Sequence, residues 1–345
     1  MLTPKNAGFR MPAEWDRHQS TWLAWPSHEH LWKEDLDAVR LAVGQIYGNL
    51  RDEAVDLLVP EKGFSADAAR WCMAAIGSSP LNVRIIPFGD IWLRDTAPIF
   101  LTDGAGRTAA VCFAFNGWGR KYVLEHDDMV STKIAAAVRI KTFRCDAVFE
   151  GGSIDVDGCG TALTTRACLL NPNRNPGLKE RDIEERLRDF LGLEKILWLN
   201  RGLVNDHTDG HVDNIARFVT QGMVACMKPA GRNDPNADVL DEIRRDLQNF
   251  RDAVGQKLDV VSVPSPGRVL DAEGKVMSAS YLNFYVGNGV VLVPIFGVRN
   301  DDAALKIIAG MYPNRRVVGI DSRALLTGGG TIHCITQQQP ARGVR

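Results

Sequence analysis

The feature that most constrains the fold is an alternation of short apolar runs with amphipathic segments along nearly the whole chain. The apolar runs are short and rich in Val and Ile, which predicts β-strands. They are Ala54–Val59, Leu81–Phe88, Ala109–Phe115, Lys195–Leu199, Gly222–Met227, Leu258–Val263, Gly289–Phe296 and Arg316–Asp321. The segments with helical periodicity are Glu34–Arg51, Ala66–Ile76, Asp128–Val138, Glu180–Leu191, Asp238–Phe250 and Ala303–Met311. This alternation favours an α/β protein.

Polar residues flanked by glycine or by strand sequence recur along this alternation. They are Asp95, Glu150, Asp213, Tyr281 and Cys334, and subtraction gives separations of 55, 63, 68 and 53 residues. A chain of 345 residues would hold five units of this size, although the units share no convincing sequence identity. A ring of five units would bring one polar end from each to a common axis. No low-complexity linker divides the chain, so we expect one domain over residues 1–345.

Composition narrows the classes of partner. The net charge is −1, so there is no bulk attraction to nucleic acid or to an anionic membrane. No apolar stretch is long enough to span a bilayer and the N-terminus lacks the core of a signal peptide, so we expect a cytoplasmic protein. The seven cysteines are scattered without a CxxC pair, which argues against a disulfide framework. A homo-oligomer is compatible with the sequence.

The first candidate site segment runs from Asp90 to Pro98, directly after an apolar run. Acids and an Arg at the end of a strand suit a functional loop. The plainer interpretation of Arg94 and Asp95 is an ion pair at the surface. Trp92 could be part of the core, or it could lie against a planar cation, which an aromatic face attracts.

The second segment begins with Glu150, which is followed by Gly151 and Gly152. Paired glycines let the backbone approach a ligand closely. The alternative is a hairpin turn with a solvated Glu, and residues 158–160, Gly-Cys-Gly, predict a hairpin nearby.

The third segment alternates His and Asp at His207, Asp209, His211 and Asp213. On a strand, His211 and Asp213 would face the same side, where a His and a carboxylate suit acid–base chemistry. The same alternation could bind a metal ion. His211 could also serve only as a hydrogen-bonded structural residue.

The fourth segment places three glycines, Gly328 to Gly330, shortly before His333 and Cys334. A nucleophilic Cys reacts as the thiolate and needs cationic or donor-rich surroundings. A buried structural Cys is the alternative, and we accept that interpretation for the other six cysteines.

Together the four segments suit a guanidinium, which is flat, always charged and carries five N–H donors. Asp95, Glu150 and Asp213 would bind it through charge-assisted hydrogen bonds. The Cys334 thiolate would then add to the central carbon. His211 would donate a proton to departing ammonia and later take one from water.

The chain resembles a known family, the agmatine deiminases and related bacterial peptidylarginine deiminases. Its motifs span almost the whole chain, at residues 9–15, 21–26, 92–96, 115–119, 150–153, 169–176, 208–214 and 328–334. The resemblance implies a fivefold pseudosymmetric α/β propeller, the pentein fold, with the site on its axis. It also implies a covalent amidino-thioester intermediate, with no metal ion and no organic cofactor.

The resemblance also assigns roles to individual residues. It implies that Cys334 is the nucleophile, that His211 is the acid–base group, and that Glu150 grips the substrate and positions His211. Asp95 and Asp213 would hold the guanidinium nitrogens and Trp92 would line the site. We add Asp90 and His207 to the expected substrate contacts.

One departure concerns the substrate. Agmatine deiminases commonly carry an acid where this chain has His207, and often a second where it has Ala7. Loss of an anion near a substrate ammonium should weaken agmatine recognition, although Asp206 could substitute. The expected reaction is agmatine plus water giving N-carbamoylputrescine and ammonia. The alternatives are deimination of peptidylarginine or another guanidine, a metal-dependent hydrolase, and a guanidine-binding protein without activity.

Overall fold

The computed structural model describes residues 2–74 and 79–343 of the chain. Within these residues the strands form five sheets. The sheet orders are β17-β2-β3-β4, β1-β5-β6-β7, β10-β9-β8, β11-β12-β13 and β14-β15-β16.

Each sheet contains a short strand paired antiparallel to a second strand, which in turn pairs parallel to a third. The short first strands are β17 (Gln337–Pro340), β5 (Ile99–Asp103), β8 (Asp155–Val156), β11 (Ala216–Thr220) and β14 (Tyr285–Val286). The second strands are β2 (His18–Ala24), β6 (Thr108–Ala114), β9 (Thr161–Thr165), β12 (Met223–Lys228) and β15 (Val290–Ile295). The third strands are β3 (Ala54–Val59), β7 (Lys141–Val148), β10 (Lys195–Leu199), β13 (Asp259–Pro264) and β16 (Arg316–Asp321), with β1 (Phe9–Arg10) and β4 (Leu81–Ile85) added at two edges.

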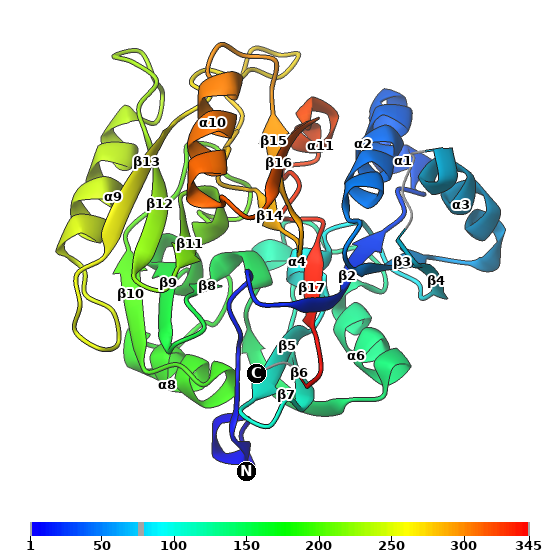
Figure 1. The fold of residues 1–345 in the computed structure, drawn as a ribbon, viewed down its shortest axis with the longest axis horizontal. Coiled ribbons are helices and arrows are strands. Elements are labelled where there is room, and N and C mark those ends of the chain that lie inside the picture. Colours follow the sequence, from blue (N-terminus) through cyan, green and yellow to red (C-terminus); the bar gives the residue numbers. More distant parts are fainter. Residues whose placement is uncertain (1, 75–78, 344–345) are drawn as a thin grey trace.

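A helix crosses between the second and third strand of every sheet, as a parallel connection requires. These helices are α2 (Leu36–Asn49), α6 (Asp127–Val138), α8 (Glu180–Leu191), α9 (Ala237–Asn249) and α10 (Asp301–Met311). They lie on the outside, and the five sheets are arranged in a ring around the centre of the molecule (Figure 1). In α8 the buried residues are Ile183, Leu187 and Leu191, one face at a spacing of four. The predicted fivefold α/β propeller is therefore confirmed.

The shorter helices belong to the connections. They are α1 (Glu29–Trp32), α3 (Ser65–Ala74), α4 (Leu93–Thr96), α5 (Gly117–Arg120), α7 (Arg166–Leu169) and α11 (Arg323–Thr327), with 3-10 turns η1 (Lys5–Ala7), η2 (Lys33–Asp35), η3 (Lys62–Phe64), η4 (Gly151–Ser153) and η5 (Val212–Asn214). The eight predicted strands and six predicted helices are all found. The strands β3, β10 and β16 and the helix α8 have the predicted bounds, and the other elements have shifted ends. The strand predicted to reach Phe88 ends at Ile85, and Ile76 of the predicted helix lies outside the described residues.

The last strand closes the ring on the first sheet. Gln337 of β17 pairs with Trp22 of β2, although more than three hundred residues separate them in sequence. The residues just before β17 are thereby fixed against the start of the chain. This closure matters for the site, because Cys334 lies three positions before the strand.

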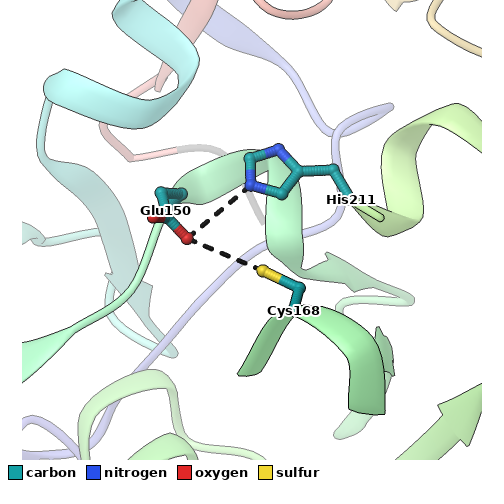
Figure 2. Close-up of side chains that lie close together, drawn as sticks. All are labelled: Glu150, Cys168 and His211. Carbon is teal, nitrogen blue, oxygen red and sulfur yellow. Dashed lines mark hydrogen bonds and ion pairs between the residues drawn. The ribbon is translucent and has the colours of Figure 1, made fainter. Parts of the chain in front are cut away.

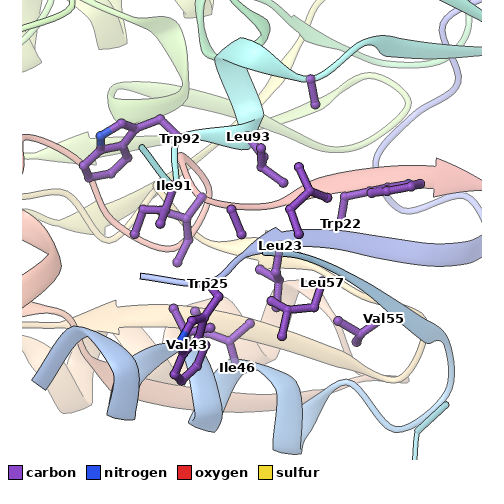
Figure 3. Packing of buried hydrophobic residues seen from close by; sticks show 14 of the residues in the cluster. Trp22, Leu23, Trp25, Val43, Ile46, Val55, Leu57, Ile91, Trp92 and Leu93 are labelled. Atoms are coloured by element: carbon purple, nitrogen blue, oxygen red, sulfur yellow. The ribbon is translucent and has the colours of Figure 1, made fainter. Parts of the chain in front are cut away.

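A large buried cluster supports one wall of the site. It joins Trp22 and Leu23 of β2, Leu57 of β3 and α2 to the segment that carries Leu93 and Trp92 (Figure 3). Trp92 thus rests on packed hydrocarbon, which restricts its orientation. None of the helices in the described part of the chain is long and apolar enough to cross a membrane.

Candidate active site

Polar side chains stand just before the first strand of every sheet. Asp95 precedes β5, Glu150 precedes β8, Asp213 precedes β11, Asn283 precedes β14 and Cys334 precedes β17. Because these strands are equivalent members of the ring, their leading residues gather near its axis. The sequence periodicity predicted this arrangement at four of the five positions. At the fifth, Tyr281 does not join the cluster, since its hydroxyl donates to Asp301 at 2.6 Å.

Asp95 is held as a hydrogen-bond acceptor at the buried end of the site. Its Oδ1 accepts from the Gly152 N–H at 2.9 Å and its Oδ2 from the Trp118 indole at 2.8 Å. The surface ion pair considered for Arg94 is not formed. Arg94 is buried and donates to Gln337 and Gln338 at 2.7 and 2.8 Å. Burial raises the pKa of Asp95 above its ordinary value, although nearby His211 lowers it.

Gly152 makes the close packing of these polar groups possible. A Cβ at this position would lie 2.6 Å from His211 Nδ1, 2.9 Å from Asp213 Oδ2 and 3.1 Å from Asp95 Oδ1. Three side chains from two separate segments of the chain therefore share the space over one glycine. His211 and Asp213 do not lie on a strand. Asp213 is in the 3-10 turn η5 and His211 is its N-cap, and the turn brings both side chains to Gly152.

Glu150 lies between His211 and Cys168 (Figure 2) and also contacts Arg174. Its Oε1 accepts from Arg174 Nε at 2.6 Å, while its Oε2 lies 3.6 Å from His211 Nε2 and 3.8 Å from Cys168 Sγ. Burial opposes ionisation, but His211 and Arg174 overcome it and lower the pKa of Glu150. For His211, burial also opposes the charge, but the carboxylates of Asp95 and Glu150 raise its pKa well above 6.5. These shifts favour a carboxylate at Glu150 and an imidazolium at His211.

A chain of hydrogen bonds through His333 fixes Asp213. His333 Nδ1 lies 2.7 Å from Asp213 Oδ2, and His333 Nε2 lies 2.7 Å from Glu14 Oε2. Burial again opposes ionisation, but hydrogen bonding and the charge of His333 lower the pKa of Asp213. The other oxygen, Asp213 Oδ1, is buried and has no hydrogen-bond partner among the described residues. Both ring nitrogens of His211 are likewise buried and have no hydrogen-bond partner among the described residues. Such unpaired buried atoms are costly unless a ligand satisfies them.

Cys334 is buried, but it lies in polar surroundings. Its Sγ is 3.2 Å from Asn283 Nδ2 and 3.9 Å from Asp213 Oδ2. Asn283 Oδ1 also accepts from the His333 N–H at 3.1 Å and from the Thr331 hydroxyl at 2.7 Å, which fixes its amide. Burial, together with the carboxylates of Asp213 and Asp95, raises the pKa of Cys334 well above its ordinary value. The unliganded site therefore holds a thiol.

A cavity of roughly 220 Å³ leads to Cys334 and Asp95. Trp92 and Asp90 form part of its wall, and Asp90 accepts from the Trp92 and Trp32 indoles at 2.8 and 3.0 Å. Burial raises the pKa of Asp90 to about 6. The remaining lining residues are Leu31, Trp118, Tyr122, Leu124, His207, Thr208, Thr327, Gly328, Gly329 and Gly330.

The outer wall of the cavity carries His207, as expected. Its ring lies 6.1 Å from that of Tyr122, and its Nδ1 occupies the space that a Cβ on Gly329 would need. Ala7 does not line the cavity, since it lies in η1, which packs against α8. Asp206 does not line it either, because its carboxylate accepts from the N–H and hydroxyl of Thr208. Neither residue is therefore placed to bind the distal end of a substrate.

The alternating His and Asp residues do not form the metal site that the sequence allowed. Across the described ranges, the acid, Cys and His side chains close enough to share an ion are Glu150, Cys168 and His211, within 4.8 Å of one another. Asp209 instead pairs with Lys121 and Arg174. Arg174 also places positive charge directly on Glu150, which opposes a bound cation there.

Sequence reasoning missed several groups in the site. Asn283 stands two residues after the position that the periodicity selected, so the repeat contained the signal but indicated the wrong residue. Arg174 and Trp118 lie within motifs noted in the sequence, but no local pattern reveals their partners. Of the six cysteines taken as buried apolar residues, Cys159 is exposed and Cys168 contacts Glu150.

Comparisons with known proteins agree with the fold. The family model for Porphyromonas-type peptidyl-arginine deiminase matches residues 10–340. The agmatine deiminase of Pseudomonas aeruginosa is 38% identical over 365 residues, covering 98% of this chain and 97% of that protein. The agmatine deiminase of Ectopseudomonas mendocina is 37% identical over 371 residues, with the same coverage. The solved agmatine deiminase of Enterococcus faecalis superimposes with a TM-score of 0.92 at 32% identity, covering 99% of this chain and 98% of that one.

The ring of five sheets with polar groups gathered on its axis places the protein in the guanidino-modifying class of α/β propellers. Within that class, the chain belongs to the Porphyromonas-type peptidyl-arginine deiminase family.

Proposed function

We propose that the protein hydrolyses agmatine to N-carbamoylputrescine and ammonia, with Cys334 as the nucleophile. The observation that carries the proposal is the unpaired buried oxygen Oδ1 of Asp213, whose other oxygen, Oδ2, lies 3.9 Å from Cys334 Sγ. A guanidinium would supply N–H donors to Asp213 and Asp95 in a space that excludes water. The agmatine deiminases among the relatives match over nearly their full length, which favours agmatine among the guanidines.

Substrate binding would also activate the nucleophile. The carboxylates of Asp213 and Asp95 oppose a thiolate at Cys334 in the empty site. A guanidinium held between the two carboxylates would offset their charge, so the thiol would lose its proton more readily with substrate bound. Asn283 Nδ2 would donate to the sulfur and stabilise its negative charge.

The first half-reaction would break the C–N bond. The Cys334 thiolate adds its electron pair to the guanidinium carbon, giving a tetrahedral adduct. His211, held as an imidazolium beside Glu150, gives its proton to the leaving nitrogen, and ammonia departs. The carbon then remains bonded to sulfur as a cationic amidino-thioester, and His211 is neutral.

The second half-reaction would restore the enzyme. Neutral His211 takes a proton from water while the oxygen adds to the amidino-thioester carbon. Collapse of this adduct returns the bonding pair to sulfur, and the urea product releases its extra proton to solvent. Arg174 keeps Glu150 ionised throughout, which favours return of the proton to His211.

A second candidate is a guanidine with a different distal group, such as a peptidylarginine. The cavity wall supports it, because the acids that line the cavity are Asp95, at its inner end, and Asp90, whose oxygens already accept from two indoles. The outer wall is formed by Tyr122 and His207, neither of which is an acid. This surface offers a bare ammonium less attraction than a carboxylate would.

An ammonia-release assay tests both candidates. Agmatine, free arginine, a peptide ending in arginine and a guanidine with a neutral tail would be compared with wild-type protein, Cys334→Ala and Cys226→Ala. Cys226 is a buried cysteine of β12 and serves as the matched control. We expect release from agmatine and a loss of at least about 10⁴-fold in Cys334→Ala only. Preference for another guanidine would favour the second candidate, and equal activity in all three proteins would refute the nucleophile.

A further inference from the structure

The segment from Thr165 to Arg174 grips the catalytic pair of Glu150 and His211 from one side. Thr165 donates its hydroxyl to the carbonyl of Gly210, the residue before His211, at 2.6 Å. Arg174 donates from Nη2 to the Thr208 carbonyl at 2.8 Å. The same segment therefore fixes the backbone that carries His211. Between its two ends, α7 presents the side chain of Cys168 to Glu150.

The two oxygens of Glu150 receive different partners from this segment. Oε1 accepts from Arg174, whereas Oε2, the oxygen nearer to His211, faces the Cys168 thiol at 3.8 Å (Figure 2). All three side chains in the figure are completely or almost completely buried, so no water competes at close range. The thiol and the imidazole therefore share one carboxylate oxygen.

We propose that Cys168 is a positioning residue whose thiol donates to Glu150 Oε2 and limits how tightly that oxygen retains the proton of His211. The inference rests on the proposed function, in which His211 must give up a proton in one half-reaction and regain it in the other. A carboxylate with no second donor on Oε2 would hold the imidazolium more firmly. His211 would then be slower to release its proton to ammonia.

The thiol can act in this way because it stays protonated. Burial, reinforced by the charge of Glu150, raises the pKa of Cys168. An S–H group is a weak donor, so it reduces the charge on Oε2 without replacing the imidazole. Cys226 is equally buried and, like Cys168, belongs to an apolar core cluster, but no carboxylate among the described residues lies within hydrogen-bond distance of its thiol.

The test compares Cys168→Ala, Cys168→Ser and Cys226→Ala by two measurements. The first is the NMR titration of His211 in protein labelled at histidine, with the resonance assigned by its loss in His211→Asn. The second is the pH profile of kcat with the best guanidine substrate. We expect Cys168→Ala to move the His211 titration and the corresponding kinetic limb to higher pH, by about 0.5–1 unit. Cys168→Ser keeps an O–H donor of similar size, so its titration should lie closer to wild type than to the Ala variant.

The proposal is overturned if Cys168→Ala titrates like Cys226→Ala, or if the Ser variant behaves like the Ala variant. The NMR titration requires no turnover, so it decides the matter even if no guanidine proves to be a substrate. Failure of the proposed function would instead appear as an absence of ammonia release by the wild-type protein. A variant that merely lost stability would show a lower melting temperature without moving the His211 titration.

Discussion

The inner end and the outer wall of the cavity are built in different ways. At the inner end, Asp95, Asp213 and Cys334 each stand just before the first strand of a different sheet, are buried and are fixed by hydrogen bonds at 2.7–3.2 Å. The outer wall comes from connecting segments, and Tyr122 in it is 50% exposed. We infer that the inner end determines the chemistry and that the outer wall determines which guanidine is accepted. The ring of sheets fixes the groups that determine the chemistry. Loop residues that the ring does not constrain determine the choice of guanidine.

A strained loop, residues 116–122, joins the inner end of the cavity to its outer wall. Trp118 has a left-handed backbone (φ 51°, ψ 51°), which is unfavourable for a bulky residue. The turn is held by Asn116, whose side chain accepts from the Gly119 N–H at 2.8 Å. The result is that the Trp118 indole reaches Asp95 while Tyr122 reaches His207. One loop therefore contacts both ends of the cavity.

The largest effect after removal of Cys334 itself should come from His211→Asn. Without an acid–base group, we expect kcat to fall by about 10²–10⁴-fold while KM for the guanidine changes little. Steady-state ammonia release measures both constants. His126→Asn, at an exposed histidine, is the control and should retain activity. A fall in kcat of less than threefold in His211→Asn would show that His211 is not the acid–base group.

The next largest effect on kcat/KM should come from Asp95→Asn, and it should exceed the effect of Asp90→Asn. Asp95→Asn loses the charge that holds the guanidinium, so kcat/KM should fall by about 10–100-fold. Asp90→Asn is closely matched, because Asp90 also accepts from a tryptophan indole and a backbone N–H, and its loss should be smaller. If the Asp90 variant were the more damaged, the assignment of binding to the inner end would be wrong.

A smaller effect is expected from His207→Asp at the outer wall. A carboxylate there would attract the distal ammonium of agmatine, so kcat/KM for agmatine should rise by about 3–10-fold. His207→Asn adds no charge and should not produce the rise. Competition between agmatine and a neutral-tailed guanidine gives the ratio directly. An unchanged ratio in the Asp variant would show that the distal group does not meet this wall.

The smallest effect on activity should come from Asp127→Asn, which instead reports on stability. Asp127 accepts from the Gly89 N–H at 2.7 Å and so supports the segment that carries Asp90. Burial raises the pKa of Asp127 from 3.8 to about 7. A raised carboxyl pKa means that the folded state binds the proton more tightly, so stability from this group declines as pH rises from about 4 to 7.

The Asn variant removes that decline. At pH 8 we expect Asp127→Asn to be more stable than wild type by about 1 kcal/mol, with the difference disappearing near pH 4. Denaturant unfolding at several pH values measures this, with the exposed neighbour Asp128→Asn as control. A constant difference at all pH values would contradict the buried charge.

The contrast between the two regions also explains what the sequence could predict. The alternation of strands and helices, the fivefold spacing and the groups Asp95, Glu150, His211, Asp213 and Cys334 were all recognisable, because each belongs to a repeated structural position or a local motif. The loops were not. Nothing in the residues around Arg174 or Cys168 indicates that they meet Glu150, because that contact depends on the path of a turn. Similarly, the sequence does not indicate that a 3-10 turn after His211 brings the side chains of His211 and Asp213 to Gly152.

The most direct test of the account is detection of the bond between sulfur and substrate carbon. Wild-type protein would be quenched in acid during turnover of agmatine, digested, and analysed by mass spectrometry. We predict that the peptide containing Cys334 gains the mass of agmatine less ammonia, and that Cys334→Ala shows no such gain. Turnover without any adduct on Cys334, or an adduct on another residue, would contradict the account.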